Sequence, residues 1–119
     1  AWNERFEADF GYKVKRPSQG VLQDVHWAAG AFGYFPTYTL GNVYAGCLFQ
    51  KMNVDIPNLD DLLSTGNPSQ ATAWLRENIQ IHGSLFEPKV TIEQATGAKI
   101  TVKPFLNYIE KKYRDIYNL

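Results

Sequence analysis

The chain has 119 residues, enough for one domain with a modest hydrophobic core. Its 12 basic and 12 acidic side chains give zero net charge, which excludes the basic footprint of a nucleic-acid-binding protein and an acidic tail. Hydrophobic residues at 45% exclude a disordered chain, and a single cysteine, Cys47, excludes an internal disulfide framework. We therefore expect an ordered cytoplasmic protein.

The first predicted helix covers residues 2–10. Trp2, Phe6 and Phe10 recur every four residues and form one stripe, and Gly11 ends the helix. The N-terminus lacks the basic and then apolar layout of a signal peptide, and it lacks an initiator methionine. We therefore expect the chain to start inside a helix, as a fragment of a longer protein would. Residues 12–19 form a predicted polar loop.

A long uncharged run follows, with no Lys, Arg, Asp or Glu between Asp24 and Lys51. Such a run raises the question of a membrane span. Four glycines, one proline and several polar side chains are dispersed through it, so we reject that interpretation. We expect a loop to about Phe35, then a helix from Pro36 to about Met52. This helix has almost no polar face, which is typical of a central helix covered on several sides.

The remaining residues predict short helices with clear start and stop signals. Asn58 is predicted to cap a helix over 59–63, which Gly66 follows. A second helix starts at Asn67 and Pro68 and extends to Gly83, and further predicted helices cover 88–97 and the C-terminal residues. The C-terminal helix carries one apolar side made by Phe105, Ile109, Tyr113 and Ile116. Alternation typical of strands is confined to fragments such as 99–103, so we expect an all-α fold with residues 1–119 in one compact helical domain.

His26 is the first candidate for chemistry. Its imidazole can donate a hydrogen bond to a substrate carbonyl or oxyanion, and Gln23 and Asp24 are close enough in sequence to orient it. A histidine in an apolar segment can equally be a structural residue. His82 is the only other histidine, and the chain has neither HExxH nor CxxC, so no metal site is predicted within it.

Tyr34 and Tyr38 are the second candidates, because a phenol near a reacting carbonyl can stabilise developing negative charge. Plain aromatic packing is the alternative for both. Structural roles explain the other chemically active side chains. Asp60 and Asp61 stand at a helix start, His82 stands in the last turn before Gly83, and Cys47 has only a hydrophobic helix around it.

Residues 20–27, GVLQDVHW, match the pattern GxxQDxHW at every fixed position: Gly20, Gln23, Asp24, His26 and Trp27. This pattern is a signature of the thermostable-carboxypeptidase (Taq-type) family of zinc metallocarboxypeptidases, which the chain resembles. Residues 1–6 and 30–42 also resemble the family, as do 74–79, 82–83 and 95–97 in family order. The resemblance covers nearly the whole chain.

The resemblance implies a C-terminal fragment of an enzyme that removes residues from peptide C-termini. Members hold Zn²⁺ on HExxH and a downstream glutamate, none of which occurs here, so the intact enzyme's metal ligands are expected in a missing N-terminal catalytic portion. By analogy with related peptidases, His26 and Tyr38 or Tyr34 would bind substrate and oxyanion. Gln23, Asp24 and Trp27 would bind substrate or position the histidine.

Other consequences of the resemblance concern assembly. The intact enzyme would be a homodimer in the cytoplasm, without nucleic-acid or membrane partners, and this fragment alone would be inactive. A second hypothesis stays open at this point. The chain can be a non-catalytic helical interaction module that retains an inherited active-site wall.

Overall fold

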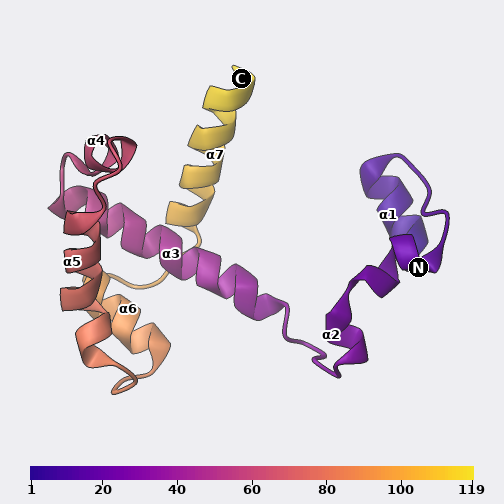
Figure 1. Cartoon of the computed structure of the whole chain (residues 1–119), viewed down its shortest axis with the longest axis horizontal. Helices are drawn as coiled ribbons and strands as arrows, with labels where there is room; N and C mark the ends of the chain where they lie inside the picture. Colours follow the sequence, from indigo (N-terminus) through magenta and orange to yellow (C-terminus); the bar gives the residue numbers. More distant parts are fainter. The chain divides into compact units, whose positions relative to one another are not determined.

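The computed structural model describes all residues, 1–119, and contains helices and turns with no strand (Figure 1). The all-α fold class is therefore confirmed. The residues divide into two compact units, Ala1–Thr37 and Tyr38–Leu119. The single helical domain expected over 1–119 stays a prediction. None of the helices combines the length and apolar character that a membrane crossing requires.

The first unit begins with α1 (Trp2–Phe10), which has the predicted bounds and ends at Gly11. The expected aromatic stripe is present: the ring centroids of Trp2 and Phe6 lie 5.2 Å apart, and those of Phe6 and Phe10 lie 4.7 Å apart. The three rings lie along one side of the helix, the first two stacked and the third tilted.

The loop predicted for residues 12–35 is wrong in part. It contains two 3₁₀ turns, η1 (Pro17–Gln19) and η2 (Val21–Gln23), and the four-residue helix α2 (Val25–Ala28). The side chain of Asp24 caps α2 by accepting a hydrogen bond from the backbone N–H of His26. A helix of one turn has no hydrophobic period, so periodicity could not reveal it.

The second unit is built around α3 (Pro36–Asp55), which crosses the boundary between the two units and runs three residues beyond the predicted end. The other elements of this unit follow in chain order: α4 (Leu59–Ser64), α5 (Ser69–Asn78), η3 (Gln80–His82), α6 (Pro88–Thr96) and α7 (Lys103–Tyr117). The core joins the end of α3 to the helices after it, through Met52, Ile56, Leu59, Trp74 and Ala95. Figure 1 shows α4, α5 and α6 gathered along this part of α3.

Two local predictions in the second unit are wrong. Asn58 makes no side-chain cap bond, because its backbone (φ −103°, ψ 24°) lies outside the extended region that directs a cap side chain at the helix N–H groups. The helix predicted to reach Gly83 ends as α5 at Asn78, and the 3₁₀ turn η3 occupies 80–82. Asn67 does act at the start of α5, where its Oδ1 accepts a hydrogen bond from the N–H of Ser69 at 3.2 Å.

Candidate functional site

The GxxQDxHW segment starts at a close contact between backbone and ring. Gly20 is buried, and a Cβ added to it would lie 2.8 Å from Cγ1 of Val14 and 2.9 Å from the Trp2 ring. A residue with a side chain would therefore push the turn away from α1. Gln23 fastens the same turn, because its Nε2 donates a hydrogen bond to the carbonyl oxygen of Ser18 at 3.0 Å. Gly20 and Gln23 thus shape the segment that carries Asp24 and His26.

Asp24 and His26 form a tight pair. Oδ1 of Asp24 accepts the backbone N–H of His26 at 2.8 Å and lies 2.7 Å from its ring Nδ1. This contact places the ring proton of a neutral histidine on Nδ1 and does not involve Nε2. Both side chains are partly buried. The prediction that Asp24 can orient His26 agrees with this geometry.

The surroundings of Asp24 stabilise its negative charge. Burial alone would raise the pKa of its carboxyl group. The hydrogen bonds from the backbone and ring of His26, the charge of that ring and a hydrogen bond from Trp27 together outweigh burial and lower the pKa of Asp24 below its ordinary value. The carboxylate is therefore ionised at neutral pH.

Aromatic rings surround His26 within the first unit. The Tyr34 ring stacks near it, with centroids 5.8 Å apart and planes at 25°, and the Phe35 ring lies closer, at 4.6 Å. The chain returns to His26 through turns at Gly30 (φ 71°) and Gly33 (φ 78°), a backbone region that favours glycine. Tyr34 is half exposed at 50%, so its ring also faces solvent.

The predicted site residues are thus brought together in part. His26, Asp24 and Tyr34 form one cluster, while Gln23 holds the preceding turn. Trp27 lies beside Phe32, with ring centroids 5.5 Å apart. Tyr38 lies in the first turn of α3 at the start of the second unit. Phe35, which also lies beside His26, was not among the predicted site residues, because the sequence shows it only as one member of an aromatic run.

The described residues contain no group of three or more His, Cys, Asp or Glu side chains positioned to hold a metal ion. His82 lies in η3 of the second unit, where its ring is 6.0 Å from that of Phe86. Cys47 is buried on α3, with Sγ 3.4 Å from the carbonyl oxygen of Thr101, and is a packing residue as expected. Residues 1–119 therefore do not fit a catalytic metal by themselves.

Comparison with known proteins gives the family. The sequence profile of the carboxypeptidase Taq (M32) metallopeptidases matches residues 1–113. Thermostable carboxypeptidase 1 of Thermus thermophilus is 44% identical over 117 residues, which are 98% of this chain and 23% of that protein. Carboxypeptidase 1 of Bacillus subtilis is 42% identical over 118 residues, 99% of this chain and 24% of that protein.

Solved structures agree with the sequence matches. The M32 carboxypeptidase of Deinococcus radiodurans R1 superposes with a TM-score of 0.86 at 34% identity, covering 99% of this chain and 24% of that one. Metallocarboxypeptidase 1 of Trypanosoma cruzi gives 0.85 at 34% identity, covering 95% and 24%. The chain spans about a quarter of the length of its relatives, which agrees with the predicted fragment. It belongs to the carboxypeptidase Taq (M32) family of metallopeptidases.

Proposed function

We propose that residues 1–119 form the C-terminal part of a zinc metallocarboxypeptidase and supply the side of its cleft that holds the substrate. The reaction is release of amino acids from the C-terminus of a peptide. The observation that carries this proposal is the cluster of Asp24, His26 and Tyr34 built by the GxxQDxHW segment. Its imidazole and phenol are groups that can bind a peptide carbonyl and a developing oxyanion, and its ionised carboxylate orients the imidazole.

The family name implies a metal, and the described residues do not provide a ligand set for one. In the proposal, zinc is held by residues of the enzyme outside 1–119. No step that depends on the metal follows from this chain, and the chain alone is inactive.

His26 is proposed to bind the substrate carbonyl through Nε2. Asp24 accepts the hydrogen bond from Nδ1 and so holds the plane of the ring. A protonated ring donates from Nε2 to an oxygen that gains negative charge as the peptide bond is attacked. Asp24 is therefore a positioning residue, which acts on the reaction through the histidine.

A tyrosine is proposed as the second donor. Tyr34 is supported by the 5.8 Å separation of its ring from that of His26, and Tyr38 by its spacing of twelve residues from the same histidine. The phenol donates a hydrogen bond to the oxyanion without losing its own proton. Gln23 shapes the preceding turn, and Trp27 is proposed to contact substrate or to support Asp24.

The partners in this proposal are the C-terminus of a peptide and the N-terminal catalytic portion of the enzyme. The homodimer and the cytoplasmic location belong to the same proposal and stay predictions. Nucleic acids and membranes are not among the proposed partners.

The test uses a chimaera in which residues 1–119 replace the matching quarter of the Bacillus subtilis carboxypeptidase 1. Release of C-terminal amino acids from a short peptide is measured for the chimaera and for the isolated chain. We expect activity from the chimaera and none from the isolated chain. Hydrolysis by the isolated chain, abolished by a chelator, would contradict its dependence on outside metal ligands. A folded but inactive chimaera, together with tight binding of the chain to a partner other than the catalytic portion, would favour the non-catalytic interaction module.

A further inference from the structure

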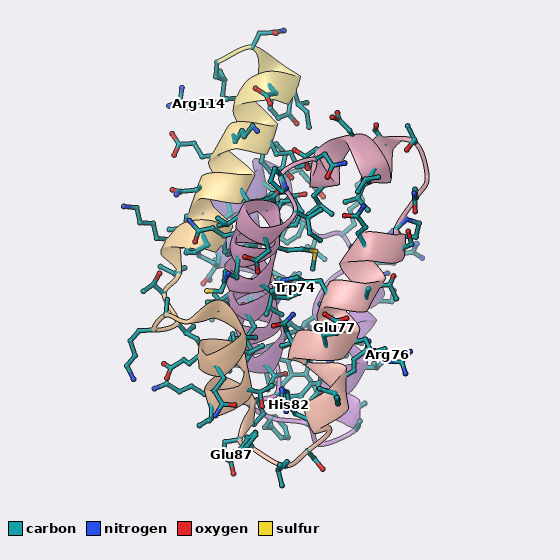
Figure 2. The ribbon with its side chains drawn as sticks, turned by 90° about the vertical axis from the view of Figure 1, so that its left-hand side faces the viewer. Trp74, Arg76, Glu77, His82, Glu87 and Arg114 are labelled. Carbon is teal, nitrogen blue, oxygen red and sulfur yellow. The ribbon has the colours of Figure 1, made fainter.

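α7 has one apolar face and one charged face. Several apolar side chains of this helix and of the residue before it are between 47% and 65% exposed: Val102, Leu106, Tyr113, Ile116 and Tyr117. The charged face carries an ion pair, in which Nε of Arg114 lies 3.0 Å from a carboxylate oxygen of Glu110. Figure 2 shows Arg114 near the C-terminal end of this helix. An amphipathic helix of this kind ordinarily places its apolar face against other protein.

Within residues 38–119, only the start of α7 packs closely on another helix. Phe105 packs so closely on α3 that a Cβ on Gly46 would lie 2.8 Å from its backbone nitrogen, and Tyr108 meets Phe49 edge-on at 6.0 Å. Every residue from Glu110 to the end of the chain is exposed. In Figure 1 the second half of α7 stands clear of α4, α5 and α6. The apolar face of this half has no cover in residues 38–119.

The length of the solved relatives indicates which protein segment can pack on the apolar face of α7. Solved chains about four times as long reproduce the fold of this one with TM-scores of 0.85 and 0.86 over 95% and 99% of its residues. Three quarters of each of those chains lies outside the matched region. A second copy is a weaker candidate, because a stable interface needs about 20–30 residues from each partner, and α7 offers a single short stripe. Cover from the same polypeptide also avoids the entropy cost of association.

We propose that the apolar face of α7 is a docking surface for the part of the same enzyme that lies outside residues 1–119, through an apolar surface on that part. This inference rests on the proposed function, in which the chain is one portion of a longer peptidase. Val102, Leu106, Tyr113, Ile116 and Tyr117 form the contact, and the charged face with Glu110 and Arg114 stays in solvent.

The experiment places one cysteine on each face of α7, as Ile116→Cys or as Arg114→Cys, in the isolated chain and in the chimaera. The rate of thiol labelling at each site is read by mass spectrometry of its peptide. In the isolated chain we expect similar rates at both sites. In the chimaera we expect labelling at position 116 to be at least about tenfold slower than at position 114, because a covered thiol reacts only when the contact opens.

Equal rates at the two sites of the chimaera would overturn the proposal. Protection of position 116 in the isolated chain that grows with concentration would also overturn it, and would identify a second copy as the occupant. Protection of position 116 in the chimaera that disappears when the enzyme is diluted to monomers would also overturn the proposal and identify a second copy as the occupant. Release of amino acids by the unsubstituted chimaera tests the proposed function separately, since an inactive chimaera can still protect position 116.

A second measurement keeps the inference testable if the chimaera does not fold. Amide hydrogen exchange is followed on the isolated chain at low concentration. Because the cover of α7 is absent there, we expect amides in its second half to exchange at least about tenfold faster than those of α5, whose Trp74 is buried in the core. Equal protection of the two helices in the isolated chain would show that α7 needs no outside cover.

Discussion

The side chain of Asp24 binds His26 twice, with one carboxylate oxygen 2.8 Å from the backbone nitrogen and 2.7 Å from Nδ1 of the ring. The first contact starts α2 and the second orients the imidazole. Asp24 therefore both ends the 3₁₀ turn η2 and orients the ring of His26. This double role explains why the aspartate and the histidine stand two residues apart in the GxxQDxHW segment.

Asp24→Asn separates these two roles. The amide oxygen can still accept the backbone N–H, but an uncharged amide is a weaker acceptor for Nδ1, so the ring is held less firmly. We expect kcat of the chimaera to fall about 10- to 100-fold with KM little changed, as for other residues that orient a catalytic group. A merely structural role would instead lower the melting temperature with kcat preserved. Asp24→Glu serves as the charge-retaining comparison.

Tyr34→Phe and Tyr38→Phe decide which phenol serves the oxyanion. Each variant keeps the aromatic ring and removes only the O–H donor. For the tyrosine that holds the oxyanion, we expect kcat of the chimaera to fall about 10²- to 10³-fold, while the other variant stays close to the parent. The ring stacking of His26 and Tyr34 makes Tyr34→Phe a test that leaves packing intact. Unchanged kcat in both variants would remove the tyrosines from the mechanism.

Gly46→Ala and Gly41→Ala form a matched pair on α3. A Cβ at Gly46 would lie 2.8 Å and 2.9 Å from backbone atoms of Phe105, whereas a Cβ at Gly41 would meet nothing within 4 Å. We expect Gly46→Ala to lower the free energy of unfolding by about 1–3 kcal/mol, because the start of α7 must move. Gly41→Ala should raise it by about 0.5–1 kcal/mol through helix propensity. Urea unfolding of the isolated chain measures both, and equal effects would contradict the close α3–α7 contact.

Asp55 makes the second unit sensitive to acid. The hydrogen bonds from Lys51 and from Nε1 of Trp74, the latter at 2.8 Å, lower the pKa of its carboxyl group below the ordinary 3.8. A lowered pKa in the folded state stabilises the protein above the unfolded value, and this contribution is lost as the pH falls through the folded value. Below about pH 4 we therefore expect stability to fall, and less steeply in Asp55→Asn. Urea midpoints at about pH 6 and about pH 3 measure this, with Asp115→Asn on α7 as control. An unchanged slope in Asp55→Asn would exclude this carboxylate as the cause.

Local signals predicted much of the fold. The stripe of Trp2, Phe6 and Phe10 together with Gly11 gave α1, and Pro88 with Gly97 gave α6, because these stops act within one turn of a helix. The helix α2 was missed because it depends on one cap rather than on a period. The cap at Asn58 was predicted and is absent, since its backbone angles depend on how the preceding α3 ends.

The sequence singled out candidate site residues, but it predicted their relative positions only in part. The pattern GxxQDxHW singled out His26 and Asp24, and a spacing of two residues allows their contact. The place of Tyr34 and Phe35 beside the ring depends on the turns at Gly30 and Gly33, whose direction no periodicity gives. The division at Thr37 lies within a helix, where composition shows no boundary.

His26→Gln in the chimaera tests the central claim most directly. The glutamine side chain keeps an N–H donor but lacks the imidazole ring that Asp24 contacts through Nδ1. Initial rates of amino-acid release from a saturating short peptide are compared with those of the parent chimaera, with folding checked by circular dichroism. We expect kcat to fall at least about 10-fold, because the glutamine amide is not held in place by Asp24 as the imidazole is. A folded His26→Gln variant with the parent's kcat would contradict the claim that this segment is one side of a peptidase cleft.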